Sequence, residues 1–297
     1  MAHEYLFWAA LFTLSAFSGL AAAWWGRGRF VRGRLAVIAA GVFLGVGLAG
    51  GALLHEPVSA YFVRIRLAGA QARTVEIFHT DGLLRALEQA EPERAEVLRG
   101  RCTQALARAS DRETAEVEGR LRLEALRVAL GAAMERLPNA SDEAAARLAS
   151  ALLAALTALA NDDSLLCLGL VHPSTAADAA LTDNALARLP EGARRDLESA
   201  LALTLATSVI RPHAAPWPQK ADAALSDMFA ETLPAFQRTY GGPKEVRALF
   251  EALADPEHAR NVAPQTLCAF ARDLLQALLR MPPEDRGPGL RRLLGAG

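Results

Sequence analysis

Aromatic side chains and a surplus of positive charge are both missing from most of this sequence. After Phe62, only seven aromatic residues remain in the 297-residue chain. From His55 onward there are 28 basic and 32 acidic residues, a net charge of −4. Proteins that bind nucleic acids neutralise phosphates with Lys and Arg and often stack bases on aromatic rings. The sequence therefore disfavours a nucleic-acid partner.

Cysteine is also scarce, with Cys102, Cys167 and Cys268 widely separated and no CxxC pair. This spacing excludes a zinc ribbon and a densely cross-linked secreted scaffold. Each cysteine lies among Leu and Ala, where a free thiol packs as a small apolar side chain, and we favour three buried, inert thiols. In an exported domain one pair would form a disulfide, with Cys102 and Cys167 as our first choice, although spacing alone does not determine pairing.

The signatures of several enzyme classes are absent. The patterns GxSxG, SxxK, GxxxxGK[ST] and GxGxxG, which mark acyl transfer and the binding of nucleotides and dinucleotides, do not occur. His55-Glu56 lacks the second histidine of a zinc-protease helix, and Pro57 follows directly. We therefore expect no cofactor and no metal, and we favour a non-enzymatic role.

The densest group of reactive side chains is Asp162, Asp163, Cys167 and His172. A thiolate nucleophile needs an adjacent base, and a zinc site needs three or four ligands, whereas Cys167 and His172 supply two. In the ordinary alternative, the two aspartates start a helix, the cysteine lies on its apolar face and the histidine precedes a terminating proline. We favour this alternative and keep the four residues as weak candidate catalytic residues.

Two long uncharged runs raise the hydrophobic share of the chain to 52%. Residues 5–25 and 35–54 are each long enough to cross the hydrocarbon core of about 30 Å as a helix. A cleaved signal peptide is the rival interpretation of the first run, but its apolar stretch is too long and no basic residue precedes it. We predict a transmembrane helical hairpin over 1–56, with the lipid bilayer as its partner.

Small residues recur at four-residue spacing in the second run. In lipid such rows let helix backbones approach closely, and a homo-oligomer could use this face. Glycine is also common in membrane helices in general, so both interpretations stand. The residues are Gly41, Gly45, Gly47 and Gly51.

The orientation of the hairpin is predicted from its short connecting loop. Four arginines, at 27, 29, 32 and 34, favour a cytoplasmic loop and place both termini outside. Arg64, Arg66 and Arg73 favour the opposite orientation, with the domain after the second run in the cytoplasm, but they lie farther from the helix ends. We favour a bacterial inner-membrane protein with two spans and a periplasmic soluble domain.

The remaining chain is dominated by Ala, Leu, Arg and Glu, which are good helix formers. Residues 61–78 fit either a small hairpin or an amphipathic helix that begins at Pro57, and we favour the helix. Pro212, Pro216 and Pro218 mark a possible boundary at 211–219, and a Pro- and Gly-rich stretch at 282–297 predicts a flexible tail. Caps and breakers predict helices near 81–90, 92–109, 113–137, 141–160, 165–171, 175–189, 191–210, 221–240, 243–254 and 264–281.

These patterns predict an all-α protein, in which the hairpin precedes an irregular multi-helix bundle or a curved helical array over 57–281. We expect a membrane-anchored protein-interaction module of a bacterial envelope, acting as a scaffold, an assembly factor or an inhibitor or immunity partner. The protein partner itself is not predicted. The alternative is a membrane-tethered enzyme with its site near Asp162 to His172.

Overall fold

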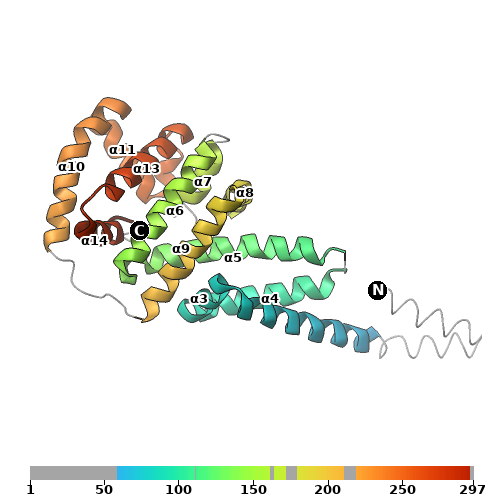
Figure 1. The fold of residues 1–297 in the computed structure, drawn as a ribbon. Coiled ribbons are helices and arrows are strands. Elements are labelled where there is room, and N and C mark those ends of the chain that lie inside the picture. Colours follow the sequence, from blue (N-terminus) through green and yellow to red (C-terminus); the bar gives the residue numbers. More distant parts are fainter. Residues whose placement is uncertain (1–58, 111, 161–163, 172–178, 211–218, 295–297) are drawn as a thin grey trace, which may run out of the picture. The chain divides into compact units, whose positions relative to one another are not determined.

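The computed structural model describes residues 59–110, 112–160, 164–171, 179–210 and 219–294, and this part of the chain is helical without strands (Figure 1). The prediction of an all-α bundle is therefore confirmed. The predicted hairpin over 1–56, with its four spaced glycines, lies outside the described residues. By contact density the chain divides into one unit of 1–73 with 103–114 and another of 74–102 with 115–297.

Residues 59–80 form a helix, which decides between the two alternatives for this stretch. Ala70, Thr74 and Phe78 are its buried residues, and their four-residue spacing places them on one helical face. Asp81 then starts α3 (Gly82–Ala90), because its Oδ1 accepts hydrogen bonds from the backbone N–H groups of Leu83 at 2.9 Å and Leu84 at 3.1 Å.

The helix starts that the sequence predicted are confirmed by the capping contacts. Helix α4 (Pro92–Arg108) begins with proline, and α5 (Thr114–Arg136) follows a cap in which the Glu113 carboxylate accepts from the backbone N–H of Ser110 at 3.0 Å. Helix α6 (Asp142–Ala160) follows the short 3-10 turn η1 (Leu137–Asn139). At its start, Ser141 Oγ accepts from the backbone N–H of Ala144 at 3.2 Å.

Helix α6 is the central helix of the larger unit. It packs against α9 (Glu191–Ile210), α13 (Pro264–Leu279), α14 (Pro283–Leu294) and α7 (Ser164–Val171) (Figure 1). Within the described residues α6 alone is long and apolar enough to cross a membrane. Half of its most apolar 18-residue stretch is buried inside the protein. Its burial inside the bundle explains its composition.

The core is built mainly from Leu and Ala, which suits closely packed helices because small side chains let helix axes approach.

Aromatic residues gather in one cluster: five of the seven after Phe62 stack edge to face between α10 (Gln219–Tyr240), α11 (Pro243–Ala254) and α13. Phe270 lies at its centre, fully buried, with ring centroids of three neighbours between 4.9 and 5.3 Å away. The cluster comprises Phe229, Phe236, Tyr240, Phe250 and Phe270.

Helix α8 (Ala179–Arg188) lies against α7 at a distance that requires glycine. A β-carbon at Gly169 would come within 2.8 Å of the Leu181 backbone, and Thr182 Oγ1 donates a 2.8 Å hydrogen bond to the Gly169 carbonyl. Thr182 is fully buried, so this bond satisfies a hydroxyl that has no access to water.

The predicted flexible tail is wrong over most of its length, since residues 283–294 form α14. Leu290 is fully buried, and Arg291 donates to the Pro138 carbonyl and pairs with the Asp142 carboxylate at 2.9 Å. Pro and Gly in this stretch give poor helix propensity, but packing against α6 overrides it. Helix α12 (Pro256–Ala259) is a short turn of helix that the sequence analysis did not predict.

Candidate functional site

Cys167 and Cys268 form a disulfide that joins α7 to α13, with the two Cα atoms 6.0 Å apart. The pairing of Cys102 with Cys167 is therefore wrong, as is the expectation of three free thiols. The helices that carry Cys167 and Cys268 are neighbours in the bundle although 101 residues separate the two cysteines. This proximity depends on the tertiary fold and leaves no trace in local sequence.

The group of candidate catalytic residues is described only at one position. Cys167 is fully buried and held in the disulfide, so it offers no thiolate for nucleophilic attack or metal binding in this state. Asp162, Asp163 and His172 lie outside the described residues. Among the described residues no three His, Cys, Asp or Glu side chains are grouped as metal ligands.

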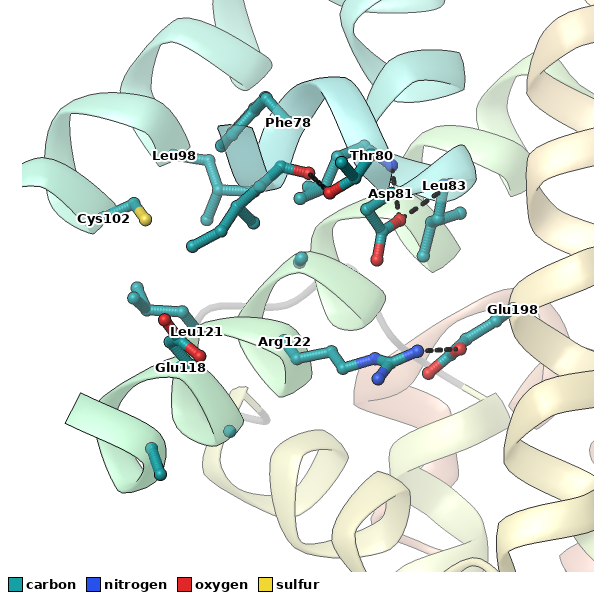
Figure 2. A pocket seen from close by; sticks show the side chains of 15 residues that line it. Phe78, Thr80, Asp81, Leu83, Leu98, Cys102, Glu118, Leu121, Arg122 and Glu198 are labelled. Atoms are coloured by element: carbon teal, nitrogen blue, oxygen red, sulfur yellow. Dashed lines mark hydrogen bonds and ion pairs between the residues drawn. The ribbon is translucent and has the colours of Figure 1, made fainter. Parts of the chain in front are cut away.

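A pocket of about 480 Å³ opens between the end of helix 59–80, α3, α4 and α5, and we call it the α4–α5 pocket (Figure 2). Phe78, Leu98 and Cys102 lie along one side, and Glu118, Leu121 and Arg122 of α5 along the other. Its volume falls in the range of about 300–1,000 Å³ that is usual for ligand-binding cavities.

The inner wall of the α4–α5 pocket is apolar. Phe78, Leu83, Leu84, Leu98 and Ala125 are each less than a tenth exposed and turn toward the pocket from four different helices. These residues also belong to the hydrophobic core, so the pocket exposes a small part of the core that an apolar group of a ligand or partner can cover. Burial of an apolar side chain there would contribute about 1.5–3 kcal/mol.

Charged residues surround the mouth of the pocket. Asp81, Glu118 and Glu198 are acidic and Arg122 is basic, so the rim carries more negative than positive charge. Arg122 Nη2 donates to Glu198 Oε2 at 2.9 Å and joins α5 to α9 (Figure 2). The Glu198 side chain is 14% exposed, and its other carboxylate oxygen, Oε1, is buried without a hydrogen-bond partner.

The Phe78 ring on the pocket wall is held in place by a basic side chain. The guanidinium of Arg99 lies 5.0 Å from the centre of this ring, a cation–π arrangement. Arg99 also pairs with Glu88 of α3, which connects α4 to α3. The Arg99 side chain therefore stabilises this wall of the pocket through its contacts with Phe78 and Glu88.

Cys102 is the free cysteine of the chain and lines the pocket, with 3% of its surface exposed. Burial raises the pKa of its thiol, a hydrogen bond from Thr74 Oγ1 lowers it, and the negative charges of Glu118 and Glu124 raise it further. The net effect is a raised pKa, which keeps the thiol protonated at neutral pH. Cys102 is thus an apolar part of the wall rather than a nucleophile.

Sequence reasoning missed this pocket because its lining comes from five segments between Ile77 and Glu198 that share no motif. The only related signal was the excess of acidic over basic residues from His55 onward. Comparisons of the chain with protein-family models, with curated proteins and with solved structures find no match.

Proposed function

We propose that this protein is a membrane-anchored helical interaction module and that a partner protein docks at the α4–α5 pocket. The single observation that carries the proposal is an apolar pocket of about 480 Å³ with charged residues at its mouth. Protein interfaces often concentrate affinity where one buried apolar or aromatic anchor enters such a pocket inside a polar rim.

The rim favours a partner segment in which a basic residue lies next to the apolar anchor. Glu118 and Asp81 add negative charge beside the Arg122–Glu198 ion pair, and a Lys or Arg of the partner would be attracted there. An acidic partner would meet repulsion at the same positions. The charges thus contribute selectivity while the apolar wall contributes affinity.

The proposed cellular placement is the outer face of a bacterial inner membrane. Disulfides persist in oxidising compartments such as the periplasm and are rare in the cytoplasm, so the Cys167–Cys268 bond supports an exported domain. An anchored module in this position would serve as a scaffold, an assembly factor or an inhibitor or immunity partner.

Site-specific photocrosslinking in native membranes tests this proposal. A photoreactive phenylalanine analogue replaces half-buried Leu121 at the pocket in one variant and exposed Arg195 of α9 in the other. We expect Leu121 to yield one discrete adduct with another protein that Arg195 does not yield. A Glu118→Arg substitution in the Leu121 variant should weaken the adduct at least fivefold.

Two results would count against this function. One is a Leu121 variant that folds, as judged by its circular dichroism, and yields no adduct of its own. The other is an adduct of unchanged strength in the presence of Glu118→Arg.

A further inference from the structure

A second cavity, separate from the α4–α5 pocket, runs between α10 and α13 and ends at the start of α14. It measures about 600 Å³, and we call it the α10–α13 groove. We propose that this groove is a docking site for a basic amphipathic helix of a partner protein. The inference does not depend on the function proposed for the other pocket.

The shape of the groove favours a helix as its occupant. Its α10 wall is formed by residues from Ala224 to Thr239 at spacings of three and four, and therefore by one face of α10 along about 22 Å. The opposite wall is the face of α13 from Asp273 to Arg280. An α10 wall of this length, with its lining residues on one helical face, suits the helix-in-groove mode, in which the guest places anchors at i, i+4 and i+7.

The floor of the groove is apolar and adaptable. Met228, Phe236 and Met281 line it, and each is less than a tenth exposed. Methionine is flexible and polarizable, so it adjusts to the side chains of a guest helix. Phe236 belongs to the aromatic cluster around Phe270, which gives the floor a rigid end.

The walls carry four carboxylates and one guanidinium, and this charge determines which helix fits. Asp227 and Glu231 are exposed and lie one turn apart on α10. Asp273 of α13 and Asp285 of α14 line the groove as well. Arg280 is the single basic residue of the lining. A guest with Lys or Arg beside its apolar stripe would gain attraction on both walls, whereas an acidic helix would be repelled.

Asp273 is held in its position on the wall by a neighbouring tyrosine. The hydroxyl of Tyr240 donates a 2.6 Å hydrogen bond to Asp273 Oδ2. The bond fixes the position of this carboxylate. One of the four acidic groups of the groove is therefore held in place by the contact between α10 and α13.

A selection from a displayed peptide library tests the proposal on the full chain in detergent micelles. The library contains helices of about 16 residues, long enough to fill the groove, with Leu fixed at i, i+4, i+7 and i+11 and the flanking positions randomised among acidic, basic and neutral residues. We expect the selected peptides to be net positive. Their affinity should fall at least tenfold for Asp227→Lys and for Glu231→Lys, and it should weaken with added salt.

Two variants separate docking in the groove from general attraction to an acidic protein. Asp196→Lys makes the same charge change at an exposed position of α9, outside the groove, and should leave affinity within twofold. Ala235→Trp adds bulk at an exposed α10 position that lines the groove and should abolish binding without disturbing the core. Selection of no peptides, selection of neutral or acidic peptides, or equal losses for Asp196→Lys and Glu231→Lys would overturn the proposal.

Discussion

Gly287 lies so close to Asp142 that a β-carbon at position 287 would come within 2.2 Å of the Asp142 Cβ atom. This approach lets α14 pack against the start of α6 and brings Arg291 to the Asp142 carboxylate, 2.9 Å away. Glycine at position 287 is thus what allows α14 to pack this closely on α6.

We predict that Gly287→Ala destabilises the domain by about 1–3 kcal/mol, because the added methyl group forces α14 away from α6. Denaturation of the full chain in detergent, followed by circular dichroism, measures the effect. Gly131→Ala is the matched control, since nothing lies within 4 Å of a β-carbon there and it lies inside α5. The control should gain about 0.5–1 kcal/mol from its higher helix propensity, and equal losses in both variants would refute the packing argument.

The disulfide provides a second prediction. Replacing Cys167 and Cys268 with Ala should lower the free energy of unfolding by about 2–5 kcal/mol, since the bond closes a loop of 101 residues. Dithiothreitol should shift the wild-type denaturation midpoint toward that of the double variant and leave the variant unchanged. A reductant effect of the same size in the double variant would contradict this explanation.

Cys102 is expected to react slowly in the folded protein. Burial both blocks access and raises the pKa of the thiol, so alkylation by iodoacetamide at pH 8 should be about a hundredfold slower than in urea. Mass spectrometry would detect a single added group, because the other two cysteines are bonded to each other. Equal rates in the folded and unfolded protein would place Cys102 at the surface instead.

Tyr240 should make the domain sensitive to strong alkali. Burial, followed by its hydrogen bond to Asp273, raises the pKa of Tyr240 well above its ordinary value of 10.0, so the fold prefers the neutral phenol. This contribution to stability is complete below pH 10 and is lost as the pH rises further, since the unfolded chain then ionises first. Tyr240→Phe should flatten the fall in denaturation midpoint above pH 10, and an identical fall in both proteins would refute the linkage.

The sequence predicted most helix bounds because their signals are local. The predicted ranges 191–210 and 243–254 agree with α9 and α11, where acidic first-turn residues and a leading proline mark the starts. Helix α14 was missed because Pro288 and its neighbouring glycines predict a loop, whereas the helix is stabilised by tertiary contacts, among them those of Arg291 with Asp142 and Pro138.

The sites were harder to predict than the helices because they depend on which helices become neighbours. The bond between Cys167 and Cys268 requires that α7 meet α13, and the α4–α5 pocket requires that Phe78 and Leu121 face each other. Neither relationship follows from spacing along the chain. The reactive side chains between Asp162 and His172 suggested a catalytic site, but Cys167 in this segment is bonded to Cys268 in a disulfide.

Helix α6 has the length and apolarity of a membrane span, and what distinguishes it from one is the protein that surrounds it. During synthesis it emerges before α9, α13 and α14, which later cover it. If the chain is made at a membrane, α6 must therefore pack against these partner helices before the bilayer takes it up as a span of its own.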